Sequence, residues 1–122
     1  MAARIKIIRS IDYMDISDNG EILFTESRKN LKKIARDDSP GDWDVLLDFR
    51  RTQWVVSTED IFNLVEVFFE DKGAFQDKVG LLLLPGVNFD NELFDELCSA
   101  YPDIPVRTFT NYEDAIQWFY AS

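Results

Sequence analysis

The strongest constraint on the fold comes from residues 43–69, where a short apolar run is followed closely by a long amphipathic segment. The run, residues 45–47, ends at Asp48 and is typical of a strand buried on both faces of a parallel sheet. The tetrad 57–60, Ser-Thr-Glu-Asp, places an N-cap residue before two acidic residues, which the positive end of a helix dipole favours. Apolar residues then recur at helical spacing as far as Phe69. We therefore expect a strand, a short connection and a well-buried helix.

The rest of the chain alternates between the same two kinds of segment. Continuous apolar runs predict further strands, and apolar residues at helical spacing predict further helices. Alternation of this kind implies right-handed crossovers and a parallel section of sheet covered by helices. The expected strands are residues 79–84 and 106–109, and the expected helices include residues 25–36 and 91–101.

A last helix is expected after residue 110. Thr110 and Glu113 match the spacing of a capping box, in which each side chain bonds to the other residue's backbone. The residues predicted to line the inner side of this helix are Tyr112, Ala115, Ile116 and Phe119.

The amino-terminal part of the chain predicts a hairpin. Residues 4–15 are rich in β-branched and aromatic residues, and the pair Asn19-Gly20 is a strong turn signal because both residues tolerate positive φ. Residues 21–24 are then expected to return antiparallel to the segment before the turn. The predicted fold is a single α/β domain of residues 1–122, with a mixed, mostly parallel sheet, an N-terminal hairpin and about four helices.

The composition favours a protein or small-molecule partner. The formal net charge of -10 disfavours nucleic acid and anionic membrane surfaces, which bind cationic patches. Cys98 is the only cysteine, so no intrachain disulfide can form, as is usual in a reducing compartment. No apolar run is long enough to span a bilayer, and no signal-peptide pattern is present. We expect a bacterial-type cytoplasmic protein without stable membrane insertion.

The side chains that enzymes commonly use are poorly represented. The chain has no histidine, so serine and cysteine nucleophiles lack their usual base. Glycine-rich phosphate loops are also absent. Cys98 lies on an apolar helix face, where a small core residue is the simpler interpretation. We therefore expect a non-enzymatic protein without a cofactor.

Two segments partly match metal-dependent sites. Residues 15–26 match the ligand spacing of an EF-hand calcium loop, but the β-branched flank does not predict a helix and a hairpin turn explains the same Asn-Gly pair. Residues 44–48 resemble the strand that carries the phosphoacceptor aspartate of response-regulator receiver domains. That chemistry needs an adjacent acidic pair after the first strand and a lysine after the last, and neither is found.

Residues 48–60, DFRRTQWVVSTED, resemble the segment of STAS domains (sulfate transporter and anti-sigma-factor antagonist) in which an aspartate ends a strand and a serine begins the next helix. In bacterial anti-sigma-factor antagonists that serine is the phosphorylation switch, and the resemblance places it at Ser57, followed by Thr58. The chain departs from the pattern at Val56, where an aspartate is usual, and at Glu59, where a glycine is usual. Helix capping alone also explains Ser57.

Over nearly its whole length the chain is similar to the SpoIIAA-like, STAS-like family of small bacterial proteins. The similar segments are DISDNGEI, DVLLDFR, STEDI, VGLLLL and VRTFTNYEDAIQWF. The resemblance implies a STAS-type fold and a regulatory or protein-binding role. A Sec14-like role in binding a small apolar ligand or lipid is the alternative.

We expect the functional surface in the connection of residues 50–57 and the helical turn after it. This connection holds large apolar residues where polar ones are usual, and tryptophan and arginine are common anchors in interfaces. Folding of Trp54 and Val56 back over the core would explain the same residues. The candidate surface or switch residues are Arg50, Arg51, Trp54, Val55, Ser57 and Thr58.

Overall fold

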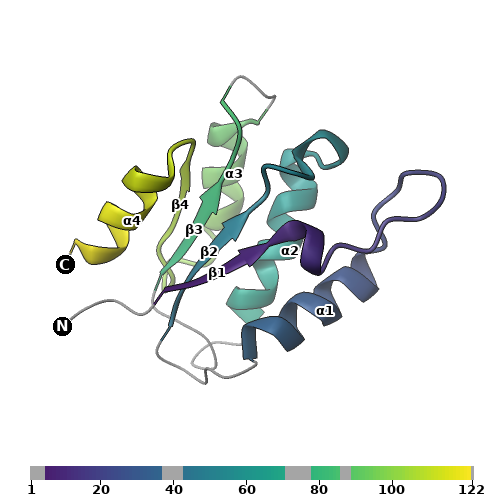
Figure 1. The fold of residues 1–122 in the computed structure, drawn as a ribbon. Helices are drawn as coiled ribbons and strands as arrows, with labels where there is room; N and C mark the ends of the chain where they lie inside the picture. The colour runs from purple at the N-terminus through teal and green to yellow at the C-terminus, as the bar shows by residue number, and fades with distance from the viewer. Residues whose placement is uncertain (1–4, 37–42, 71–77, 86–88, 122) are drawn as a thin grey trace.

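The computed structural model of the chain describes residues 5–36, 43–70, 78–85 and 89–121. The predicted alternation of strands and helices after the N-terminal segment is confirmed (Figure 1). In chain order the elements are β1 (Ile5–Arg9), the 3-10 helix η1 (Ser10–Asp12), α1 (Phe24–Arg36), β2 (Asp44–Asp48), the 3-10 helix η2 (Gln53–Val55), α2 (Thr58–Glu70), β3 (Val79–Leu82), α3 (Asn91–Cys98), β4 (Val106–Phe109) and α4 (Tyr112–Tyr120).

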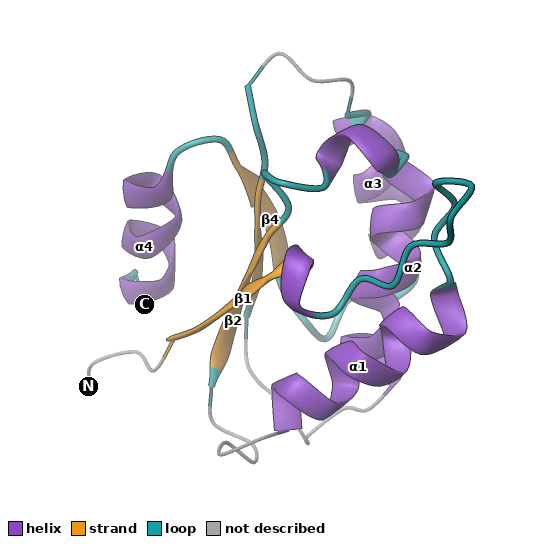
Figure 2. Cartoon of the chain, turned by 45° about the vertical axis from the view of Figure 1, so that its right-hand side comes forward, coloured by secondary structure: helices purple, strands orange, loops and turns teal. Residues whose placement is uncertain are grey.

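The strands form one sheet in the order β1-β2-β3-β4, and all three pairings are parallel. Each crossover advances by one strand in the same direction, so right-handed connections place α1, α2 and α3 on one face of the sheet. After β4 the chain turns to the opposite face, where α4 lies alone among the described helices (Figure 2).

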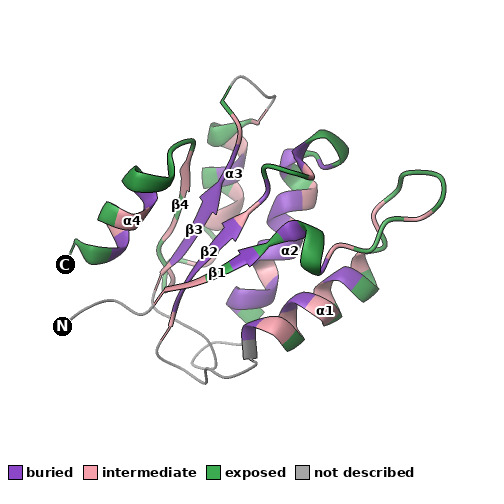
Figure 3. Ribbon diagram, in the orientation of Figure 1, coloured by how far each residue is buried: buried purple, intermediate pink, exposed green. Residues whose placement is uncertain are grey.

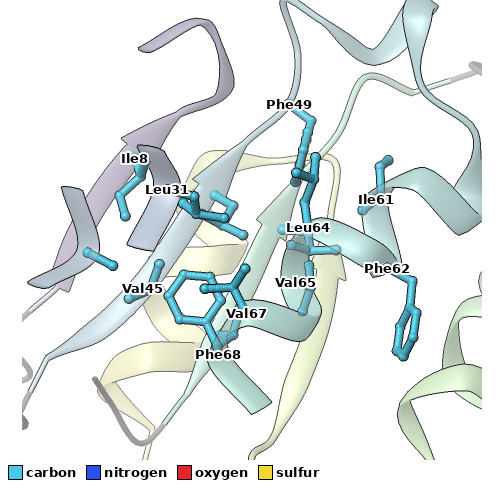
Figure 4. Packing of buried hydrophobic residues seen from close by; sticks show 14 of the residues in the cluster. Ile8, Leu31, Val45, Phe49, Ile61, Phe62, Leu64, Val65, Val67 and Phe68 are labelled. Carbon is cyan, nitrogen blue, oxygen red and sulfur yellow. The ribbon is translucent and has the colours of Figure 1, made fainter. Parts of the chain in front are cut away.

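The core lies mainly between the sheet and α1, α2 and α3. Alternate residues of the strands point to this side and meet the apolar face of α2, as Figure 4 shows for Val45, Leu64 and Phe68. A second, smaller cluster joins the other face to α4 through Leu46 and Phe119. The central strands β2 and β3 are therefore buried on both faces, as their continuous apolar runs predict (Figure 3).

The predicted mixed sheet with an N-terminal hairpin is wrong for the described residues. Gly20 has φ 82° in a turn, and Ile16 and Ile22 form one isolated antiparallel bridge. The bridge extends no further because helical hydrogen bonding starts at once: the N–H of Ser27 donates to the carbonyl of Leu23 at 2.9 Å. The chain also leaves the sheet after β1, because Tyr13 packs into the core with 1% of its surface exposed.

The predicted cap of α4 is displaced by one residue. Oδ1 of Asn111 accepts hydrogen bonds from the N–H groups of Glu113 at 2.8 Å and Asp114 at 3.2 Å, so Asn111 is the N-cap in place of Thr110. Ala115 and Phe119 are buried as predicted, whereas Tyr112 is 45% exposed and does not line the inner side.

Candidate functional site

The connection from β2 to α2 lies at the carboxyl ends of the parallel strands, the edge at which open α/β sheets usually bind their ligands. All six candidate residues, from Arg50 to Thr58, fall on this connection or on the first turn of α2. The structure therefore keeps them at one edge of the sheet, but it gives them different environments.

Asp48 and Arg50 form a closed pair at the end of β2. The guanidinium of Arg50 donates to both carboxylate oxygens, at 3.0 and 2.9 Å, and the backbone N–H of Arg50 donates to Oδ1 at 3.0 Å. Burial alone would raise the pKa of the Asp48 carboxyl, but the hydrogen bonds from Arg50 and the charges of Arg50 and Arg51 outweigh it and hold the pKa below its ordinary value. Both carboxylate oxygens of Asp48 therefore already accept hydrogen bonds from Arg50, and this pair stabilises the start of the connection.

The middle of the connection is pinned to the body of the protein. Gln53 is 2% exposed, and its Oε1 accepts a hydrogen bond of 2.7 Å from the N–H of Leu84, just after β3. The hydroxyls of Thr52 and Ser10 lie 2.5 Å apart, which joins η2 to η1. Val56 is buried at the other end of the turn. The segment is therefore held at both ends and at its centre.

Trp54 points away from this pinned turn. Its side chain is 75% exposed, and the neighbouring Val55 is 44% exposed. Of the two residues that could have folded back over the core, Val56 does so and Trp54 does not. Ile11, on the adjacent η1, is also 54% exposed. Sequence reasoning missed Ile11, because residues 4–15 resemble strand and a 3-10 turn has no distinctive pattern at this length.

Ser57 is the N-cap of α2, as predicted. Its Oγ accepts from the N–H of Asp60 at 3.1 Å, and Oδ2 of Asp60 accepts from the N–H of Ser57 at 3.0 Å. The two residues therefore form a reciprocal capping box. Thr58 has a different role: it is buried, and its Oγ1 accepts a hydrogen bond of 2.9 Å from the N–H of Asp90, which links the starts of α2 and α3.

Two hollows adjoin this surface. One, of about 430 Å³, is lined by Val56, Ser57, Thr58, Phe89 and Asp90. The other, of about 310 Å³, lies where the chain leaves β3 for α3 and leaves β4 for α4, so the two connections diverge to opposite faces and leave a crevice. The crevice is lined by apolar side chains such as Leu83 and Phe109 and by the polar side chains of Asn91, Thr108 and Thr110, so apolar and polar groups contribute about equally.

The remaining candidates for chemistry are the Cys98 thiol and clusters of metal-binding side chains. Burial, and after it the charge of Asp95, raises the pKa of the Cys98 thiol to about 12, so the thiol is protonated at neutral pH. Within the described ranges, no group of three or more histidine, cysteine, aspartate or glutamate side chains is placed to hold a metal ion. In residues 15–26, the segment with EF-hand spacing, hydrogen bonds from the N–H of Gly20 to the carbonyl of Ser17 and from the N–H of Ser17 to the carbonyl of Glu21 close a turn, and α1 begins at Phe24.

Comparison with protein-family models, curated proteins and solved structures finds no match to this chain. Among the helices that the structure describes, none has both the length and the apolar character needed to cross a bilayer.

Proposed function

We propose that this chain is a non-enzymatic, STAS-type regulatory module that binds a protein partner through the surface carrying Trp54. The observation that supports this most is the 75% exposure of Trp54 on a turn whose neighbours Gln53 and Val56 are buried. A large aromatic side chain gains by leaving water, and a pinned backbone loses little conformational freedom when it is bound. Trp54 is therefore suited to be the anchor of an interface.

The charges around Trp54 define the kind of partner. Arg50 and Arg51 both lie just before the turn and are exposed, and the ion pair between Arg50 and Asp48 neutralises the charges of both its members. Arg51 therefore carries the positive charge that this pair does not compensate, on a chain whose net charge is -10. A partner with an apolar pocket and acidic residues at its edge complements this arrangement.

The direct test is photo-crosslinking in the native host. A benzoylphenylalanine at position 54 is expected to form an adduct with the partner, whereas the same probe at Leu23, which is 43% exposed on another part of the surface, is not. With the partner purified, Trp54→Ala should weaken binding by about thirtyfold or more, the loss expected for an interface anchor. Leu23→Ala is the control. Equal binding by Trp54→Ala and the unmodified chain would refute the proposal.

The resemblance to anti-sigma-factor antagonists raises the question of a phosphorylation switch at Ser57. Our hypothesis is that Ser57 is not phosphorylated in the cell, because its hydroxyl already caps α2 and a phosphate dianion would meet the carboxylates of Glu59 and Asp60. Intact-mass measurement of protein from the native host tests this. A substantial species one phosphate heavier, mapped to Ser57 or Thr58, would make a switch the better interpretation.

The crevice between the ends of β3 and β4 supports a second candidate, the binding of a small apolar ligand. Its volume of about 310 Å³ and its mixed lining of apolar and polar groups suit a small neutral molecule with an apolar body and a few hydrogen-bonding groups. Mass spectrometry of solvent extracts from protein purified from its native host would detect such a ligand. Its loss on Phe109→Asp, with the fold intact, would locate it in the crevice.

A further inference from the structure

The sheet face that carries α4 is only partly covered. α4 packs on β3 and β4, and through Phe119 it reaches Leu46 of β2. In the described part of the chain no helix covers β1 on this face, and Ile7 of β1 is 48% exposed (Figures 1 and 3). Parallel sheets are normally covered on both faces, because their strands carry apolar residues on both. Ile5, at the start of β1, packs against the edge of the α4 cluster, but the face over the rest of β1 lacks a covering layer among the described elements.

The helix beside this gap presents an apolar flank to it. Asp114 and Trp118 line a hollow with Arg107 of β4, so this flank of α4 faces the outer edge of the sheet. Ala115 and Phe119 point into the sheet. With about 100° between successive helical residues, the flank opposite Asp114 and Trp118 must face β1. That flank consists of Tyr112, Ile116 and Tyr120.

We call the surface made by Ile5, Ile7, Tyr112, Ile116 and Tyr120 the open strip. Three of its members are well exposed: Ile7 at 48%, Tyr112 at 45% and Tyr120 at 56%. The strip is therefore an apolar corner, with β1 as its floor and α4 as its wall. A second helix with an apolar flank would fill it.

Charges at one end of the open strip distinguish between possible occupants. Arg9 ends β1 at the carboxyl edge of the sheet, where it forms an exposed ion pair with Asp12. α4 starts at the same edge, because only Thr110 and Asn111 separate it from β4, and the exposed Glu113 lies in its first turn, on the side away from its own sheet. An exposed ion pair contributes little to stability, so Arg9 can exchange Asp12 for a carboxylate of another molecule. The surface thus offers this cation on the floor and Glu113 as an anion on the wall at the same height.

We propose that a second copy of this chain covers the open strip in a symmetric dimer. A two-fold axis parallel to the strands places the two α4 helices side by side between two facing sheets, so that each α4 covers β1 of the other copy. Ile116 then lies against Ile116 of the second copy, Tyr120 over Ile5, and Glu113 next to Arg9. Both halves of the interface are present on one surface, as an isologous contact requires.

The first test is the oligomeric state of the whole chain. Sedimentation and light scattering over a range of concentrations should show a monomer–dimer equilibrium. Ile7→Asp should raise the dimer dissociation constant by about tenfold or more, because it places a charge at the centre of the interface. Ile11→Asp is the matched control: Ile11 is as exposed, at 54%, but lies on η1, outside the open strip, so dimerisation should be unchanged. Circular dichroism and urea unfolding check that both variants fold.

The second test addresses the arrangement of the two copies. Arg9→Glu and Glu113→Arg should each weaken the dimer, and the double variant should restore it, because the reversed pair meets again across the two-fold axis. Trp54→Ala should leave the dimer intact. A monomer at every concentration, an Ile7→Asp variant that dimerises as well as the unmodified chain, or a double variant no tighter than the single ones would each overturn the proposal.

Discussion

Single side chains at the carboxyl edge of the sheet differ in whether they hold the fold together or lie exposed on the surface. Ser57 and Gln53 hold the connection in place, whereas Trp54, one residue after Gln53, is 75% exposed. Substitutions within a few residues of each other should therefore have opposite effects. Changes at Ser57 or Gln53 should lower stability, and changes at Trp54 should lower binding with stability preserved.

Ser57→Ala should lower the free energy of unfolding by about 1 kcal/mol, because the first turn of α2 loses the side chain that caps the N–H of Asp60. Ser57→Thr keeps a hydroxyl at the same place and should recover most of the loss. Urea unfolding at neutral pH measures both. An unchanged midpoint for Ser57→Ala would show that the capping bond contributes nothing.

Tyr13 should make the fold sensitive to alkali. Burial, and after it the charge of Asp48, raises the pKa of Tyr13 above its ordinary value. The folded state therefore keeps a proton that the unfolded state loses, so this contribution to stability is complete below about pH 10 and falls by about 1.4 kcal/mol for each pH unit above it. Tyr13→Phe should flatten the decline between pH 9.5 and 11 in urea unfolding. The exposed Tyr112, changed to Phe, is the control, and equal slopes for the two variants would contradict the assignment.

At the scale of elements, the pattern of apolar residues predicted those strands and helices whose position depends on burial. The runs of β2 and β3 and the spacing of α2 each identify a buried element, and the structure confirms all three. The pattern could not predict η1 and η2, because a single 3-10 turn is set by tertiary anchors such as the Ser10–Thr52 contact. The pattern also predicted an antiparallel return strand after the Asn-Gly turn. The turn does form, but it closes a single bridge beside α1.

The candidate surface was predictable in part. Trp54 and Val55 stand out in the sequence because apolar residues are unusual in a connection, but their exposure depends on how Gln53 and Val56 are anchored. The open strip was not predictable at all. It exists because all three crossovers take the same face and leave α4 to cover the other, which is a property of the sheet order.

The packing of α4 depends on Gly80 of β3. A Cβ at this position would lie 2.9 Å from Cζ of Phe119 and 3.3 Å from Cδ1 of Leu46. Gly80→Ala should therefore push α4 outward and destabilise the fold by about 1–3 kcal/mol, the usual cost of overpacking. Phe119→Leu alone should also destabilise, but the double variant should be more stable than the sum of the two effects predicts. Thermal unfolding of the four proteins tests this coupling, and strict additivity would contradict it.

At the scale of the whole molecule, charge is unevenly divided. Residues 1–51 contain ten basic and ten acidic residues, whereas residues 52–122 contain three basic and thirteen acidic ones. The negative charge thus belongs to the part of the chain that forms α2, α3 and α4. Because α2 and α3 lie on one face of the sheet and α4 on the other (Figure 2), both faces carry part of this negative charge, which attracts basic groups.

This imbalance should make stability depend on salt through α3, whose last turn contains no basic residue. Glu96 lies near the negative end of the helix dipole and four residues after Glu92, so both the dipole and its neighbour disfavour its charge. Glu96→Gln should raise the free energy of unfolding by about 0.5 kcal/mol at low ionic strength.

Glu92→Gln is the matched control, because Glu92 lies in the first turn, where the dipole favours a negative charge and offsets the repulsion from Glu96. Urea unfolding at about 10 mM and 1 M sodium chloride should show a gain for Glu96→Gln alone that disappears at the higher concentration, since the exposed charges are then screened. Equal gains for both variants would assign the effect to net charge, and a gain that persists in 1 M salt would assign it to packing.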